Sequence, residues 1–275
     1  MAVSAPPAPS RASLRSGELA LSAYESFAPY YDRFTEECKY EKWLISIEAW
    51  AIANGLAGNR LLDVACGTGK SFAPLLDRGY QVTACDLSPA MVAVARRKFG
   101  ERVKVCVADM RELDWRNQFD LITCIDDAMN YLLTRRDLAR ALAGMARALR
   151  PGGILVFDTN SLATFRTSFA QEYEFQAGPV RYRSCGEGSP TTPAGTVSSA
   201  TLEATGPDGA STTRHVERHW PVSELRDACS AAGLSHIRFR GQLTGCRLLG
   251  EPDEQRHTKV VCLARKGVSS RKGCP

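Results

Sequence analysis

Five short apolar runs, separated by helical or turn segments, follow one another between residues 60 and 158. Strand-length runs that alternate with helical segments at this spacing are typical of βαβ units, whose strands lie parallel in one sheet. A Pro-Gly-Gly sequence precedes the fifth run and marks a turn there. The pattern predicts an α/β fold with a doubly wound, mostly parallel sheet. The expected strands are 60–65, 81–86, 103–108, 119–125 and 154–158.

The segments before and after this block have different patterns. Residues 1–17 are rich in Pro, Ala and Ser, which predicts a disordered tail. Residues 18–56 have a helical pattern with many aromatic side chains, and Pro29 is expected to divide them into at least two helices. Residues 160–220 form short alternating stretches separated by turns. We interpret them as a small antiparallel β insert.

The last part of the chain returns to the α/β pattern. A helix is expected at 222–232, and two strands at 237–243 and 260–265 would complete a sheet of seven strands. The expected divisions are a tail at 1–17, a helical lid at 18–56, a cofactor-binding core at 57–159, the insert at 160–220, the end of the core at 221–266 and a tail at 267–275.

The composition is that of a globular protein that needs neither a metal ion nor a membrane. Hydrophobic residues make up 44% and charged residues 24% of the 275-residue chain. None of the ten cysteines forms a CxxC pair or a zinc-type Cys/His cluster, so no metal site is expected. The net charge of +5 is modest, and no apolar run has membrane-spanning length. We therefore expect a cytoplasmic protein, monomeric or homo-oligomeric, with no nucleic-acid or membrane partner.

The turn after the first expected strand contains Gly67 and Gly69. Such a turn lets the backbone approach a nucleotide-like ligand closely, and the following helix offers free N–H donors. A dinucleotide fingerprint would need a third glycine where Phe72 stands. A P-loop would need its first glycine where Val64 stands, although 69–71 matches the end of that pattern. Both interpretations are therefore disfavoured.

A third interpretation rests on a family resemblance. The segment 63–69, Asp-Val-Ala-Cys-Gly-Thr-Gly, resembles motif I of class I S-adenosylmethionine-dependent methyltransferases, with Ala65 where many members have glycine. The segments 108–110, 119–132 and 149–158 resemble later motifs of that family, in the same order. The chain is similar to its small-molecule, specialised-metabolite members. The resemblance implies a Rossmann-like methyltransferase fold with an N-terminal helical lid.

The resemblance implies that S-adenosylmethionine is the cofactor and that it lies along the strand ends. Asp86, which ends the second strand, can accept hydrogen bonds from both ribose hydroxyls, as the equivalent acid does in dinucleotide folds. In the family, the position of Asp109 lies near the adenine amine and that of Met110 against the ring. The expected cofactor-binding residues are Tyr31, Trp43, Asp63, Ala65, Cys66, Gly67, Gly69, Asp86, Leu87, Met91, Ala108, Asp109, Met110 and Ile125.

Methyl transfer is an in-line displacement, so the protein mainly has to align the acceptor and exclude water. Amine acceptors must be neutral to react, whereas phenols or acidic carbons need a base. The candidate catalytic residues are Asp126, Tyr31 and His215, and further candidate bases are Asp127, Tyr30 and His219.

The expected acceptor is a small molecule of secondary metabolism, methylated at an amine nitrogen or at an aromatic or indole-type N, C or O. Lid residues and the loop after the fourth strand would align or deprotonate it. Three alternatives remain open: an RNA or protein methyltransferase of the same fold, a non-catalytic nucleotide-binding module, and an NAD(P) enzyme.

Overall fold

The structure is a computed structural model that describes residues 11–207, 209–243 and 246–268. Its central element is a seven-stranded sheet. Its strand order is β10-β11-β5-β4-β1-β2-β3. Strands β1 to β5 pair parallel with one another, and β11 pairs antiparallel with both β5 and β10, so β11 alone runs in the opposite direction in this sheet. The predicted doubly wound, mostly parallel sheet is confirmed. The strands are β1 (Arg60–Val64), β2 (Gln81–Asp86), β3 (Lys104–Val107), β4 (Phe119–Cys124), β5 (Leu149–Asn160), β10 (Leu234–Gln242) and β11 (Lys259–Lys266).

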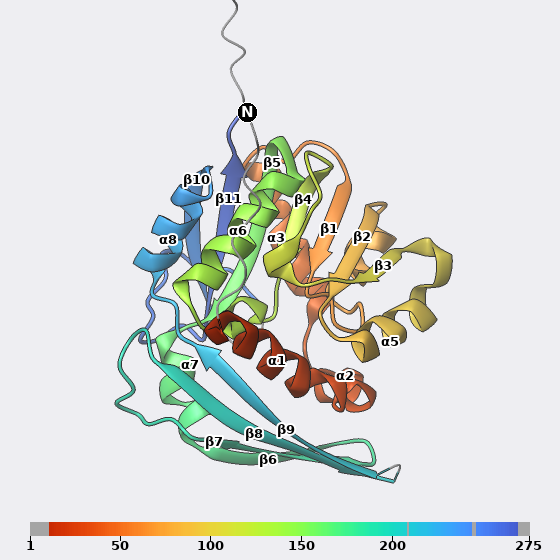
Figure 1. The fold of residues 1–275 in the computed structure, drawn as a ribbon, viewed down its shortest axis with the longest axis vertical. Helices are drawn as coiled ribbons and strands as arrows, with labels where there is room; N and C mark the ends of the chain where they lie inside the picture. The colour runs from red at the N-terminus through yellow and green to blue at the C-terminus, as the bar shows by residue number, and fades with distance from the viewer. Residues whose placement is uncertain (1–10, 208, 244–245, 269–275) are drawn as a thin grey trace, which may run out of the picture.

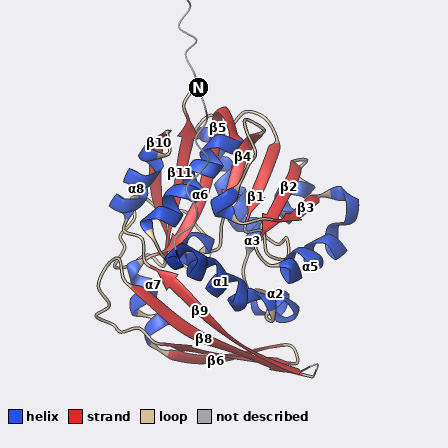
Figure 2. Cartoon of the chain, in the orientation of Figure 1, coloured by secondary structure: helices blue, strands red, loops and turns tan. Residues whose placement is uncertain are grey.

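Helices cover both faces of this sheet (Figure 2). Side chains alternate along each strand, so Leu61 and Leu62 enter two different hydrophobic cores. Helices α6 (Arg135–Ala148) and α8 (Val222–Ala231) pack against the face of Leu62. Helices α3 (Tyr40–Ala53), α4 (Ala73–Asp77) and α5 (Pro89–Phe99) pack against the face of Leu61. The apolar runs read from the sequence are thus buried on both sides, as parallel strands require.

A second sheet of four antiparallel strands lies beyond the carboxyl ends of the main strands (Figure 1). It contains β6 (Glu172–Ala177), β7 (Val180–Gly186), β8 (Val197–Gly206) and β9 (Gly209–Arg218). Helices α1 (Arg11–Glu25) and α2 (Ala28–Phe34) lie between the two sheets (Figure 1). Phe27 and Phe34 pack edge-on against Tyr182 of β7, which fastens the helices to the second sheet.

Some expectations differ from the structure. Helix α1 begins at Arg11, inside the segment expected to be a tail, and Ser16 is buried with its hydroxyl donating to Asp137 Oδ2 at 3.1 Å. Small side chains such as Ala20 and Ala23 let this helix approach the core closely. Helix α7 (Leu162–Arg166) lies within the expected β insert. Of the tails expected at 1–17 and 267–275, residues 1–10 and 269–275 lie outside the described residues.

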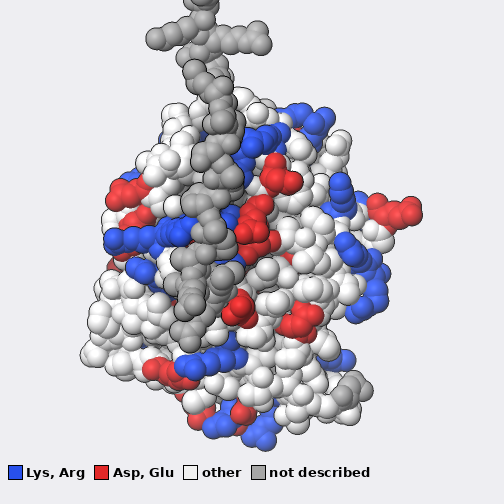
Figure 3. Space-filling model, in the orientation of Figure 1, with Lys and Arg blue, Asp and Glu red and all other residues white. Residues whose placement is uncertain are grey.

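The surface gives two further observations. On the face shown in Figure 3, acidic and basic side chains are interspersed and do not form one continuous basic stripe. Among the described residues, no helix combines the length and the hydropathy needed to cross a membrane.

Candidate active site

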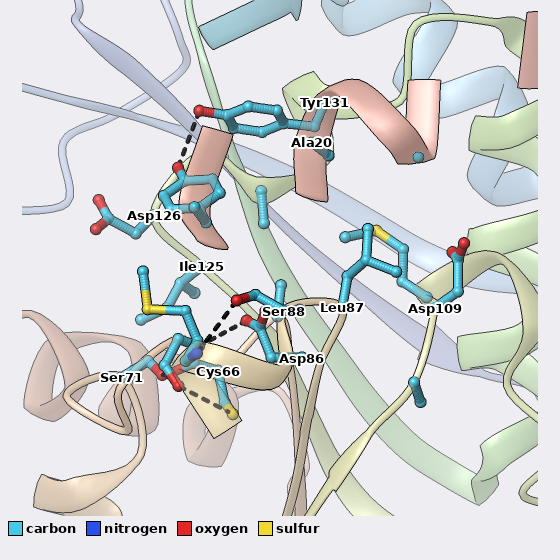
Figure 4. Close-up of a pocket in the computed structure, with 18 of the residues that line it drawn as sticks. Ala20, Cys66, Ser71, Asp86, Leu87, Ser88, Asp109, Ile125, Asp126 and Tyr131 are labelled. Atoms are coloured by element: carbon cyan, nitrogen blue, oxygen red, sulfur yellow. Dashed lines mark hydrogen bonds between the residues drawn. The ribbon is translucent and has the colours of Figure 1, made fainter. Parts of the chain in front are cut away.

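A cavity lies at the carboxyl ends of β1 to β4, where α1 and α2 cover it. The space inside it, including the part open to solvent, is about 920 Å³. Figure 4 shows the labelled side chains spread from Asp126 at one end to Asp109 at the other, with Asp86 between them. Helix α1 contributes Ser16, Gly17, Ala20 and Tyr24 to the lining.

The turn after β1 forms one wall of this cavity. Ala65 and Gly67 have φ values of 58° and 53°, in the left-handed region. That conformation costs an alanine about 1–2 kcal/mol, which explains why glycine suits position 65 in similar proteins. The backbone N–H of Gly67 points to Asp86 Oδ2, 2.8 Å away. The turn is therefore tied to the end of β2.

Asp86 is the polar centre of the cavity wall. Its Oδ1 accepts from the N–H of Ser88 at 2.9 Å, so each carboxylate oxygen already holds one backbone N–H. Burial raises the pKa of Asp86, and the N–H donors of Ser88 and Gly67 oppose that effect. Each oxygen keeps a free lone pair, which leaves the carboxylate able to accept from two hydroxyls of a ligand.

The far end of the cavity combines apolar side chains with an ion pair. Leu87, Ala108 and Met110 line it. Both oxygens of Asp109 contact the Arg111 guanidinium, at distances of 2.5–3.0 Å. Asp109 is thus already paired, and a ligand amine there would compete with Arg111 or share the carboxylate with it.

The structure brings most of the predicted cofactor residues to this cavity. They are Tyr31, Ala65, Cys66, Gly67, Asp86, Leu87, Met91, Ala108, Asp109, Met110 and Ile125.

Three predicted residues lie outside the lining. Trp43 is 3% exposed and packs in the core between α3 and the sheet. Asp63 is fully buried and accepts from the hydroxyls of Ser71 and Thr123, both at 2.5 Å, so it orients the turn from below. A Cβ on Gly69, at φ +90°, would lie 2.4 Å from the Phe99 ring, so close packing demands this glycine.

The loop after β4 is held in an unusual conformation. Asp126 and Asp127 both have left-handed backbones, with φ values of 70° and 59°. The carboxylate of Asp158, on β5, accepts both of their N–H groups at 2.6 and 3.2 Å. Lys259 of β11 then contacts Asp158 at 2.8 Å and Asp126 and Asp127 at 3.4 Å each. The hydrogen bonds to Asp158 and the ion pairs with Lys259 stabilise the loop enough to hold it in this strained backbone conformation.

Asp126 is kept ionised in this loop. Burial acts to raise its pKa, but Lys259 and the hydroxyls of Tyr40 and Tyr31 hold the pKa below its usual value. The two hydroxyls donate to Oδ2 at 2.5 and 3.3 Å. Burial and Asp126 raise the pKa of Tyr31 well above its usual value, so Tyr31 acts as a hydrogen-bond donor and not as a base.

A second cavity lies between the lid helices and the insert sheet, with an open volume of about 930 Å³. It shares a wall with the first cavity, formed by Tyr24, Tyr31, Asp126 and Tyr131. One side of it is apolar, with Phe27, Phe34, Phe169 and Leu202. The other side is polar, with Asp127, Asn160, His215 and Glu217.

His215 lines this second cavity and is absent from the lining of the first. Its Nδ1 lies 2.7 Å from the Tyr131 hydroxyl and its Nε2 lies 3.1 Å from that of Thr213. Burial lowers the pKa of His215 to about 4, so the ring is neutral at pH 7. His219 is buried against Glu254 and lies outside both linings, which makes it a structural residue.

Sequence reasoning missed several lining residues. Glu217 and Asn160 were not selected, nor was Lys259, because they come from the insert sheet and from distant strands. One signal was available: His215 and Glu217 stand two residues apart on β9 and therefore face the same side. For α1, no local pattern pointed to the cavity.

Comparisons with known proteins agree with this geometry. A family model described as a methyltransferase domain matches residues 61–153. A demethylmenaquinone methyltransferase from Renibacterium salmoninarum is 33% identical over 181 residues, which cover 62% of this chain and 72% of that protein. The solved structure of a sugar N-methyltransferase from Streptoalloteichus sp. is 25% identical with a TM-score of 0.67, over 97% of this chain and 99% of that chain.

Some matches are partial. A relative from Bacillus subtilis, named as a methyltransferase, is 36% identical over 141 residues, which cover 50% of this chain and 56% of that protein. The chain thus spans little more than half the length of that relative.

Proposed function

This chain belongs to the class I S-adenosylmethionine-dependent methyltransferase family, and from that premise we propose that it transfers a methyl group to a small-molecule acceptor. The observation that carries the proposal is the junction of two cavities. The first adjoins the glycine turn and Asp86, and the second lies under the insert sheet. They meet at Tyr31 and Asp126, which line both. A donor in one cavity and an acceptor in the other would face each other across this junction.

The first cavity has the side chains that the cofactor needs. S-adenosylmethionine, when bound, supplies an electrophilic methyl carbon on a positively charged sulfur. The free lone pairs of Asp86 suit two ribose hydroxyls, and Leu87 and Met110 suit the faces of an adenine ring. Backbone groups of Ala65 and Gly67 suit the methionine part.

The lid residues would align the reactants and exclude water. Glu25 accepts from the hydroxyl of Ser88 at 2.6 Å, and Asp32 accepts from that of Thr68 at 2.5 Å. These contacts tie α1 and α2 to the loops around the cavity. The ionised Asp126 lies at the junction, where its charge stabilises positive charge on either side.

The second cavity supports an amine acceptor better than an apolar aromatic one. Its polar side carries Asp127, Asn160 and Glu217, and the carboxylate oxygens there can accept further hydrogen bonds from an amine, which a purely apolar ring could not donate. Similarity to a sugar N-methyltransferase over 97% of the chain agrees with a polar amine. We place this reaction in secondary metabolism. An RNA or protein acceptor is less favoured, because α1 and α2 line the first cavity, the insert sheet lines the second, and the charges on the face in Figure 3 are interspersed.

Methyl transfer from labelled S-adenosylmethionine tests this proposal. The purified chain would be incubated with amino sugars, alkylamines, phenols, demethylmenaquinol, transfer RNA and a lysine-containing peptide. We expect label on an amine of a small molecule. Transfer only to RNA or peptide, or no transfer to any member of the panel, would contradict the proposal.

A further inference from the structure

Three polar side chains from distant parts of the chain meet on the polar side of the second cavity. Asn160, at the end of β5, donates through Nδ2 to Asp127 Oδ2 at 3.0 Å and to Glu217 Oε2 at 2.9 Å. Glu217 on β9 is 4% exposed. One amide therefore holds two carboxylates side by side in a cavity that adjoins the candidate cofactor site.

We propose that Asp127 and Glu217, joined by Asn160, bind the acceptor as an alkylammonium ion and take one of its protons before methyl transfer. This inference rests on the proposed function. It specifies the class of acceptor and the residues that receive the proton. Asn160 would act as a positioning residue, because it orients both carboxylates without touching the reacting nitrogen.

The charge balance around the pair supports a cationic ligand. Lys259 forms ion pairs with Asp126, Asp127 and Asp158, while Glu217 receives its hydrogen bond from Asn160. Three carboxylates thus contact one ammonium group, and Glu217 adjoins them through Asn160, so a second cation would offset excess negative charge in this cluster. The titratable groups that face the pair are Asp126, Asp158, Lys259, Tyr24, Tyr131 and His215.

The same surroundings make the pair able to accept a proton near neutral pH. Burial raises the pKa of Asp127 to about 7, and Asp126 and Asp158 add to this while Lys259 opposes it. Burial and Asp127 raise the pKa of Glu217 well above its usual value. A carboxyl group with a pKa near 7, such as that of Asp127, can bind an ammonium ion when ionised and hold its proton afterwards.

The proposed reaction balances in two steps. The ammonium N–H bond breaks and the proton moves to a carboxylate oxygen of the pair, which leaves a neutral amine with a free lone pair. The lone pair then forms the C–N bond to the methyl carbon while the C–S bond breaks and its electrons go to sulfur. The product leaves as an N-methylammonium ion, and the carboxyl group returns its proton to solvent.

Two other predicted bases fit this role less well. Asp126 is held ionised by Lys259 and two tyrosine hydroxyls, so it has little tendency to take a proton. Both ring nitrogens of His215 are occupied by neighbouring hydroxyls. Asp126 and His215 would help to shape the junction of the two cavities, whereas Asp127 or Glu217, the pair joined by Asn160, takes the proton.

Calorimetry with two probes of the same shape tests the inference on protein loaded with S-adenosylhomocysteine. Cyclohexylamine is cationic at pH 7.5 and cyclohexanol is neutral. We expect cyclohexylamine to bind at least about 10-fold more tightly, since charge-assisted hydrogen bonds are roughly twice as strong as neutral ones. The variants Asp127→Asn and Glu217→Gln should lose the preference, and the control Glu203→Gln, whose side chain is 42% exposed and lies outside the second cavity, should keep it.

The outcomes separate the inference from the proposed function. If S-adenosylhomocysteine does not bind the unmodified chain, the proposed function fails. If it binds but cyclohexylamine does not bind, or the variants keep the preference, only the inference is overturned. Retained S-adenosylhomocysteine affinity in each variant shows that the fold is intact. If Asp127→Asn does not fold, the test is made with Glu217→Gln alone, because Glu217 lies on the insert sheet, outside the main sheet.

Discussion

Replacing Lys259 by methionine would remove the cation from the carboxylate cluster while keeping much of the side-chain volume. Lys259 lies 2.8 Å from Asp158 and 3.4 Å from Asp126 and Asp127, and its side chain is 16% exposed. Breaking a buried ion pair by removing one partner typically costs about 3–5 kcal/mol, because charge is left buried without compensation. For a chain of this size, that loss corresponds to a fall in melting temperature of roughly 6–20 °C.

The loss should depend on pH. Burial raises the pKa of Asp127 to about 7 in the folded protein, and removal of Lys259 would raise it further. A carboxyl group whose pKa is higher in the folded than in the unfolded state favours folding at low pH and loses that contribution as pH rises through the folded value. The Lys259→Met variant should therefore be least stable, relative to the unmodified chain, at pH 8 and should recover part of the difference at pH 5.

Thermal unfolding at several pH values measures this effect. Lys98→Met is a matched control, because Lys98 pairs with Asp32 at the surface, where the two side chains are 33% and 42% exposed. Surface pairs contribute about 0–1 kcal/mol. Equal losses in the two variants, or a Lys259→Met deficit that grows on acidification, would refute the reasoning about the cluster.

Three further predictions concern single residues. Asp86→Asn should weaken S-adenosylhomocysteine binding by about 10- to 150-fold in calorimetry, since a charged acceptor contributes about 1.5–3 kcal/mol. The exposed Asp114→Asn control should bind as before, and unchanged affinity in Asp86→Asn would remove that residue from the site. Gly69→Ala should lower stability by about 1–3 kcal/mol in urea unfolding, because its Cβ would meet the Phe99 ring at 2.4 Å, and an unaffected midpoint would contradict this. His215→Gln should reduce the loss of stability between pH 6.5 and 4.5, since the pKa of His215 is lowered to about 4 in the folded state, and an unaltered pH profile would contradict that.

Most of the fold could be predicted because its signals are local. Apolar runs of strand length alternate with helical segments, and parallel strands buried on both faces need such runs. Helix α4 begins only at Ala73, because the Ser71 hydroxyl donates to Asp63 and thereby holds Ser71 in the turn. The first part of helix α1, residues 11–17, was missed because its small and polar side chains resemble those of a disordered segment.

The candidate cofactor residues were predictable for a related reason. The carboxyl ends of parallel strands lie along one edge of the sheet, so residues such as Ala65, Asp86 and Asp109 must come together once the strands are identified. Trp43 was expected to bind the cofactor but packs in the core. An aromatic residue on a helix near the site can do either, and the sequence pattern does not distinguish the two.

The second cavity could not be predicted in the same way. It depends on how α1, α2 and the insert sheet pack against the main sheet, and these contacts join residues far apart in sequence. Asn160 meets Glu217 on β9, and Lys259 on β11 meets the loop after β4. No local pattern encodes such meetings, although the alternation along β9 restricts which of its residues can face the lid.

Calorimetric titration of the unmodified chain with S-adenosylhomocysteine and, separately, with NADH tests the central claim most directly. The account predicts saturable binding of S-adenosylhomocysteine, lost or weakened in Asp86→Asn, and no binding of NADH. Binding of NADH without binding of S-adenosylhomocysteine would contradict the assignment of the cavity at the strand ends.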